Sequence, residues 1–331
     1  MAAPARRESR ARGPLVLLGA TVVIWGTGYW PTAVAAEHGS ALMVTGLRLA
    51  PGALVMLAAV WLLGAQLPRG RMLGWAVLTG LLMVAIFQWG LTEAIARAGS
   101  GNGAILINTN PLIVLVLAWI FLRERLSPLG VAGLLAGFGG VALMVSSQLG
   151  GSVETRQLLL GSALALIAAL GWAIGVLILR KLSQRPGGID MVGITAVQFV
   201  VASVLILPIA FAVDGTSTTD WGSGTLWGTI VWIGPAATVG VLFFYLALER
   251  LSAAKTSSSL FLVPAVAVIV EIARGSTPGV AVLVGMLVAV VGVALAVVPV
   301  EQLAAIWRWP GQLRRRPVAA IEIRPEDSDT P

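Results

Sequence analysis

The chain has 331 residues, of which 57% are hydrophobic and 11% charged, with a net charge of +7 and a mean hydropathy of +0.92. Soluble domains carry about 25% charged residues, so the composition excludes a soluble globule and indicates a polytopic membrane protein. The chain has no cysteine and one histidine, His38, which excludes disulfides, thiolate metal sites and a histidine cluster. We therefore expect no metal and no other cofactor.

Ten apolar segments follow one another along the chain, each about long enough to cross a roughly 30 Å hydrocarbon core as a helix. The first, preceded by arginines and containing Ala33-Val34-Ala35, also has features of a cleaved signal peptide. A retained helix is the simpler interpretation, because the segment is long enough to span and begins a regular series. We predict an all-α fold with ten transmembrane helices at residues 14–36, 41–64, 72–95, 101–121, 128–147, 158–180, 190–213, 225–248, 255–273 and 279–300.

The basic residues are distributed unevenly between the two ends of these spans. If the termini share one side, eighteen of the 22 Lys and Arg residues lie on that side, three lie on the other, and Arg48 lies within a span. This asymmetry satisfies the positive-inside rule and predicts that both termini are cytoplasmic in a bacterial-type inner membrane. The positive charge is thus explained by orientation in a lipid bilayer, and no nucleic-acid partner is expected.

The stretch 94–111 recurs at 247–264. In both copies we expect a helix end, a short loop of small residues, and an apolar helix broken by Pro111 or Pro264. Five spans lie on each side of a polar segment, and two homologous halves with an odd number of spans must be inserted upside down relative to each other, as in secondary transporters. The predicted organisation is a cytoplasmic basic arm at 1–13, a first repeat at 14–147, a linker at 148–157, a second repeat at 158–300 and a disordered cytoplasmic tail at 301–331.

Four short motifs occur in the first half. They are Trp25-Gly26-Thr27, Leu47-Arg48-Leu49-Ala50, the small-residue run 98–104 that leads to Pro111, and the Arg-Glu-Arg-Leu-Ser-Pro turn at 123–128. Together they resemble the EamA domain of the drug/metabolite transporter superfamily, and the resemblance covers residues 14–300. The second half departs from the pattern, because Ser276 and Thr277 stand near the place that corresponds to Glu124. The resemblance implies alternating access around a central cavity lined by spans 1–4 and 6–9, with spans 5 and 10 peripheral.

Arg48 lies about seven residues into the second span, where an ionisable side chain is costly unless it faces partners or water. We predict that it binds a substrate carboxylate or phosphate. The alternative is a structural role, in which it snorkels to the outer interface or bonds to carbonyls of a neighbouring helix. Uncharged polar residues at mid-depth either bind substrate or hydrogen-bond to other helices, and they are Gln88, Asn108, Asn110 and Gln198.

Aromatic residues also lie away from the span ends. Trp25 and Trp172 occupy corresponding places in the two halves, so they are predicted to face each other across the cavity and stack on a substrate, unless they pack against lipid. Tyr29 and Tyr245 are further candidates for substrate binding. Glycines that allow close helix contact, either within a monomer or in a homodimer, are Gly133, Gly137, Gly140, Gly285 and Gly292.

Glu93 is the candidate for proton coupling, because a low-dielectric site can raise the pKa of a carboxyl group into the physiological range. Arg97 follows four residues later, in the order that favours a helical ion pair, so a structural pair is the alternative. Pro111 and Pro264 each remove a backbone donor and free a carbonyl in the preceding turn. Each proline either presents polar backbone to the cavity or simply kinks its helix.

We expect a secondary transporter that exports a small metabolite, an amino acid or a related compound, by alternating access, as the resemblance implies. Uptake or drug efflux by the same fold is an alternative, and a cationic drug would favour Glu93 over Arg48 as the binding charge. A membrane enzyme or a non-transporting scaffold fits less well, since the loops are short and lack the clustered acids, histidine or lysine of an active site.

The topology is testable with single cysteines, because the chain has none of its own. We expect Ser252→Cys to face the cytoplasm and Gly99→Cys, at the corresponding place in the first half, to face outward. An impermeant thiol reagent added to intact cells should label only Gly99→Cys. Equal labelling of both positions from outside would contradict the inverted repeat.

Overall fold

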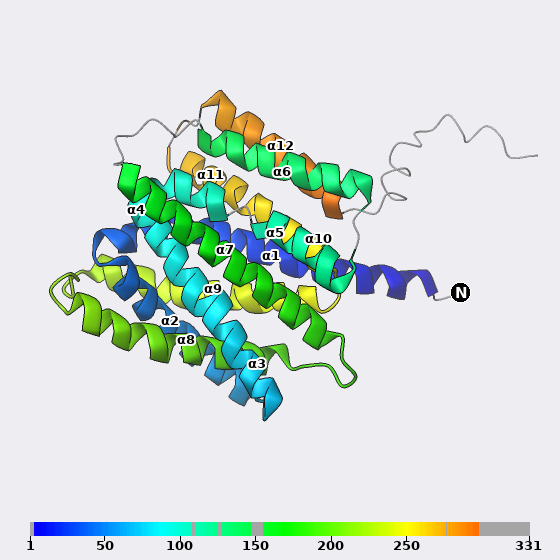
Figure 1. Ribbon diagram of the computed structural model, residues 1–331, viewed down its shortest axis with the longest axis horizontal. Coiled ribbons are helices and arrows are strands. Elements are labelled where there is room, and N and C mark those ends of the chain that lie inside the picture. The colour runs from blue at the N-terminus through cyan, green and yellow to red at the C-terminus, as the bar shows by residue number, and fades with distance from the viewer. Residues whose placement is uncertain are drawn as a thin grey trace, which may run out of the picture. The chain divides into compact units, whose positions relative to one another are not determined.

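The computed structural model describes residues 3–107, 110–124, 127–146, 155–275, 277 and 279–297, and the regular structure in these ranges is helical (Figure 1). Two short π-helical segments, η1 and η2, and one 3-10 segment, η3, interrupt or extend the α-helices. In chain order the elements are α1 (Ala3–Glu37), α2 (Ala41–Leu63), α3 (Arg71–Gly80), η1 (Leu81–Ile86), α4 (Phe87–Ile107), α5 (Asn110–Leu117), η2 (Ala118–Leu122), α6 (Pro128–Ser146), α7 (Thr155–Ser183), α8 (Met191–Asp214), α9 (Gly224–Leu248), α10 (Ala253–Ser258), η3 (Ser259–Leu262), α11 (Val263–Ala273) and α12 (Val280–Val297).

The predicted fold class is confirmed. Among the described residues, seven helical segments are long and apolar enough to cross a membrane, and three shorter apolar helices complete the series. The shorter ones are Asn110–Leu122, Pro128–Leu143 and Val280–Ala296. The expected helix breaks lie near the starts of α5 and α11: Pro111 is the second residue of α5, and Pro264 is the second residue of α11, directly after the 3-10 segment.

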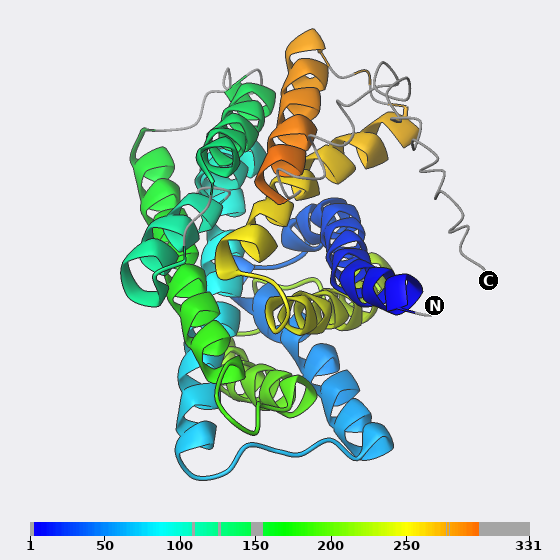
Figure 2. The same ribbon diagram turned by 90° about the vertical axis from the view of Figure 1, so that its right-hand side faces the viewer.

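The helices pack in pairs that join the first half (α1–α6) to the second (α7–α12), and these pairs keep the symmetry of the repeat. Helix α1 packs on α9, and its counterpart α7 packs on α4; likewise α1 contacts α11, and α7 contacts α5. Helices α2 and α8 pack on each other, as do α6 and α12 (Figures 1 and 2). Because exchanging the halves leaves this set of contacts unchanged, the packing agrees with the two-fold relation expected of inverted repeats.

The prediction of a small-residue loop in the first copy is wrong, because residues 98–103 are helical and α4 continues to Ile107. In the second copy the helix does end, and Ser252 caps the next helix by accepting a hydrogen bond from the backbone N–H of Lys255. The corresponding residue of the first copy is Gly99, which has no side chain to act as a cap. Small residues without a cap or a proline do not end a helix in an apolar setting, where backbone groups must be satisfied within the segment.

Helices α6 and α12 touch through their backbones at glycines. A Cβ atom added to Gly133 would lie 2.6 Å from the carbonyl oxygen of Gly292, and one added to Gly140 would lie 2.5 Å from that of Gly285. Beside this contact, side chains of both helices and of η3 form a small apolar cluster that consists of Leu134, Val141, Phe261, Val282, Ala289 and Val293. The glycines thus serve close packing of the two peripheral helices within one chain.

We predict that Gly140→Ala destabilises the protein by about 1–3 kcal/mol, because the added methyl group overlaps backbone that cannot move aside. Gly139→Ala is the matched control, since a Cβ there has nothing within 4 Å. Thermal unfolding of the purified protein in detergent measures both variants. Equal melting temperatures for the two variants would contradict a backbone contact at Gly140.

Candidate functional site

A cavity of about 90 Å³ lies between helices of the two halves. It is lined by α1, α2, α4, α5, α7, α9, η3 and α11, so that both halves contribute and the peripheral helices α6 and α12 do not. The wall is mainly apolar, with few polar side chains. The lining residues are Ile24, Trp25, Gly28, Tyr29, Thr32, Arg48, Phe87, Gln88, Leu91, Ile107, Asn110, Trp172, Trp232, Ile233, Ala236, Ala237, Leu260 and Val263.

Arg48 supplies the charge of this cavity. Its side chain is buried, with 5% of its surface exposed, and its Nη2 donates a hydrogen bond of 2.6 Å to Oε1 of Gln88. A weaker contact of 3.4 Å joins its Nη1 to the hydroxyl of Thr32. Both partners are neutral, and no carboxylate among the described side chains forms an ion pair with Arg48. The guanidinium therefore lies at the cavity wall without a carboxylate counter-ion among the described side chains.

Three lining residues carry a buried polar atom that has no hydrogen-bond partner within the described structure. They are Arg48 through Nε, Asn110 through Oδ1 and Trp172 through Nε1. Two of these atoms donate hydrogen bonds and one accepts them. Leaving a buried polar group unpaired costs free energy, so a ligand with complementary groups would gain by reaching them.

A cluster of four aromatic rings lies beside the cavity. The rings of Trp25 and Trp172 meet edge to face, with centroids 5.5 Å apart, and Phe244 stacks on Trp25 at 6.0 Å. Phe87 completes the cluster against Trp172 at 4.7 Å. The two tryptophans therefore touch each other directly, which leaves no space for a substrate to stack between them as the sequence suggested.

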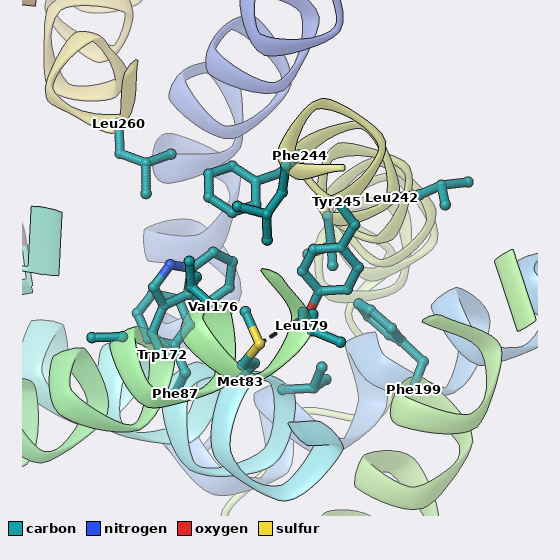
Figure 3. Close-up of a cluster of buried hydrophobic side chains, with 14 of the residues drawn as sticks. Met83, Phe87, Trp172, Val176, Leu179, Phe199, Leu242, Phe244, Tyr245 and Leu260 are labelled. Atoms are coloured by element: carbon teal, nitrogen blue, oxygen red, sulfur yellow. Dashed lines mark hydrogen bonds between the residues drawn. The ribbon is translucent and has the colours of Figure 1, made fainter. Parts of the chain in front are cut away.

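The cluster continues into the buried core of the bundle (Figure 3). In that view Tyr245 points its hydroxyl at the sulfur of Met83, and the two atoms lie 3.5 Å apart. Gln198 donates a hydrogen bond of 2.7 Å to the hydroxyl of Thr79. Neither Tyr245 nor Gln198 lines the cavity, whereas Trp25, Tyr29, Arg48, Gln88, Asn110 and Trp172 all do. Asn108, the remaining candidate, lies outside the described residues.

Glu93 is not among the residues that line the cavity. Its carboxylate accepts a hydrogen bond of 2.7 Å from Nε of Arg97, one helical turn later, and Arg97 also reaches the side chain of Gln157 on α7 at 3.2 Å. The alternative considered from the sequence, a structural ion pair, is therefore present in this structure.

Sequence reasoning missed several lining residues, of which Thr32 is the most informative. Gly28 and Tyr29 lie three and four residues after Trp25, and Thr32 lies four and three residues after them, which places all four on one face of α1. The helical period from Trp25 was a usable signal for Thr32. No comparable signal marked Trp232 or Phe87, because large apolar residues occur on every face of these helices.

Comparison with known proteins agrees with this architecture. The model of the EamA-like transporter family matches residues 12–146 and again residues 159–298. The uncharacterized transporter YvbV of Bacillus subtilis is 26% identical over 77% of this chain and 81% of its own length. The uncharacterized inner membrane transporter YedA of Escherichia coli K12 is 28% identical over 80% of this chain and 85% of its own length.

The uncharacterized transporter sll0355 of Synechocystis is 28% identical over 78% of this chain and 81% of its own length. A protein of known crystal structure superposes with a TM-score of 0.73 at 19% identity, covering 89% of this chain and 98% of that one, which shows a shared fold. Two family matches, one for each half, cover most of the sequence. The chain therefore belongs to the EamA-like transporter family and is a multi-pass membrane transporter rather than an enzyme.

Proposed function

We propose that the protein exports a small amino acid or a related zwitterionic metabolite across the bacterial inner membrane by alternating access, with both termini in the cytoplasm. The observation that carries the substrate class is the buried guanidinium of Arg48, which lies at the wall of a mainly apolar cavity and has no carboxylate partner among the described side chains. The resemblance to the family supports the proposed direction of transport, and the charge asymmetry of the sequence supports the proposed orientation in the membrane.

A carboxylate is the substrate group that best complements Arg48. An anion would supply the counter-charge that the described structure lacks, and its oxygens would accept from the unpaired Nε. A charge-assisted hydrogen bond in a low-dielectric site is stronger than one between neutral groups. The neutral partners Gln88 and Thr32 orient the guanidinium without cancelling its charge.

The ammonium group of an amino acid has a complementary acceptor in Asn110, whose Oδ1 is buried and unpaired. The apolar wall around these two residues, including Ile24, Leu91 and Val263, suits the substrate side chain. A cationic drug fits less well, because none of the lining residues is acidic and Glu93 is already paired with Arg97.

The proposal is tested by counterflow in proteoliposomes with a panel of amino acids, carboxylates and cationic drugs. We expect saturable exchange of at least one amino acid, and Arg48→Ala should raise its apparent KM about tenfold or more, as expected for loss of a charge-assisted bond. Arg48→Lys should rescue only in part, because lysine lacks the planar fork. Asn110→Leu should lower the apparent affinity for amino acids more than the apparent affinity for simple carboxylates, which have no ammonium group.

The control for these variants is Gln198→Leu, which removes a buried polar side chain that does not line the cavity. It should leave the selectivity of counterflow unchanged. Exchange of cationic drugs alone, with Arg48→Ala as active as the unmodified protein, would overturn the assignment. The direction of transport is determined with the substrate found in this way, by comparing its flux in inverted and in right-side-out membrane vesicles.

Glu93 is tested separately. Because the structure pairs it with Arg97, we expect Glu93→Gln and Arg97→Gln to leave proton-gradient-driven flux intact and to lower stability by up to about 0.5 kcal/mol, as for a helical ion pair. Flux with and without an imposed proton gradient measures the effect. Loss of gradient-driven flux in Glu93→Gln with counterflow preserved would instead assign it the coupling role.

A further inference from the structure

One cluster of polar groups lies away from the cavity, where the ends of several helices meet. Arg180, near the end of α7, places its Nε 3.3 Å from Oε1 of Glu124, which follows η2. The exposed fractions of the two side chains are only 14% and 17%. An ion pair as sheltered as this one contributes more than a pair on the open surface, because water screens it less.

Both members of the pair also bind backbone at the turn between α9 and α10. Arg180 donates through Nη1 to the carbonyl oxygens of Leu248, at 2.9 Å, and Glu249, at 3.0 Å. Glu124 accepts from the N–H of Ala253 through its other oxygen, at 2.9 Å. One carboxylate and one guanidinium thus join the end of α5–η2 in the first half to α7, α9 and α10 in the second.

The chain conformation around Glu124 supports this arrangement. Arg123 has a φ of 56°, the left-handed region that residues other than glycine rarely adopt, and it ends η2 directly before Glu124. Among the described non-glycine residues it is the one with a positive φ. The backbone turns sharply here, and Glu124 follows this turn to reach Arg180 and Ala253.

The polar cluster around Glu124 and Arg180 lies farther from the cavity than the aromatic cluster does. Along α9 the order is Ala237 at the cavity wall, Phe244 in the aromatic cluster and Leu248 at the polar cluster, about 16 Å from Ala237 by helical rise. Along α7 the same order holds, with Arg180 about 12 Å beyond Trp172. The aromatic rings and then the polar cluster thus separate the cavity from this end of the bundle.

The repeat places no equivalent pair at the opposite end. The offset that relates Trp25 to Trp172 relates Ala33 to Arg180, and the offset of the recurring stretch relates Glu124 to Thr277. Alanine and threonine cannot form an ion pair. The Glu124–Arg180 pair is therefore specific to one end of the bundle, although the helices around the two ends are related by the repeat.

We propose that Glu124 and Arg180 form a gate latch, which closes the cavity toward the end where α9 meets α10 and which must break when that end opens. The proposal rests on alternating access, in which the halves move against each other, and the latch bridges the halves. It is independent of the identity of the substrate. The latch stabilises the conformation that is closed at its own end.

The test uses Ala236→Cys as a reporter, since Ala236 lines the cavity and the chain has no other cysteine. An impermeant thiol reagent is applied to membrane vesicles of each orientation. Gln184→Cys, at an exposed position four residues after Arg180, identifies the face on which the latch lies. We expect Arg180→Gln to raise labelling of the reporter from the latch face about tenfold, as for loss of one charge-assisted bond, and to lower labelling from the opposite face.

Further variants separate a latch from a general defect. Glu124→Gln should also raise labelling of the reporter from the latch face. The double variant should be labelled only slightly more than the stronger single variant, because both substitutions remove one interaction. Arg180→Lys should be labelled less than Arg180→Gln, because it keeps the positive charge. Arg185→Gln, which removes an exposed charge near the same end, is the matched control and should change nothing. Unchanged labelling from the latch face in both Arg180→Gln and Glu124→Gln would overturn the proposal, as would a rise from both faces. Because labelling does not require transport, either result leaves the counterflow test of function independent.

Discussion

A guanidinium group cannot be placed inside an apolar bundle without partners, and the arrangement of the cavity follows from how this requirement is met at Arg48. Its hydrogen bonds reach Thr32 on α1 and Gln88 on α4, so three helices of the first half converge on one side chain. The remaining requirement, a counter-charge, is not met within the described structure. A protein that stabilised itself alone would place a carboxylate nearby, and leaving the charge open is the feature expected of a binding site.

The other close contacts of the bundle use very different chemistry. Where α2 meets α9, and where α6 meets α12, glycines let one backbone approach another, as at Gly234 against the carbonyl of Arg48 and at Gly133 against Gly292. These contacts need no polar groups and leave no space for solvent. The structure thus separates two kinds of contact: glycines hold helices together, and the aromatic cluster fills the space beside the cavity, where Arg48 supplies the charge.

The sequence predicted the number and the order of the membrane segments because hydrophobic length and the positive-inside rule are properties of the chain itself. It misplaced the boundary near residues 98–103, since whether a small-residue run ends a helix depends on a cap, which Ser252 supplies in one half and Gly99 cannot in the other. The free-energy cost of burying a charge made Arg48 a candidate for substrate binding. Six of the nine candidates chosen from the sequence line the cavity.

The sequence did not reveal partners brought together by the fold. Arg180 and Glu124 are 56 positions apart, and nothing local indicates that they meet. Trp25 and Trp172 were matched by the repeat, but only side-chain packing decides that they touch.

The contact between α6 and α12 has a consequence for the biogenesis of the protein. Helix α6 ends at Ser146, whereas its partner begins only at Val280. During synthesis the glycine face of α6 therefore enters the bilayer long before the surface that covers it has left the ribosome. Until then this face is exposed to lipid or to transient neighbours, so docking of α12 is a late step of assembly, and the insertion machinery or a chaperone has a long interval in which to shield α6.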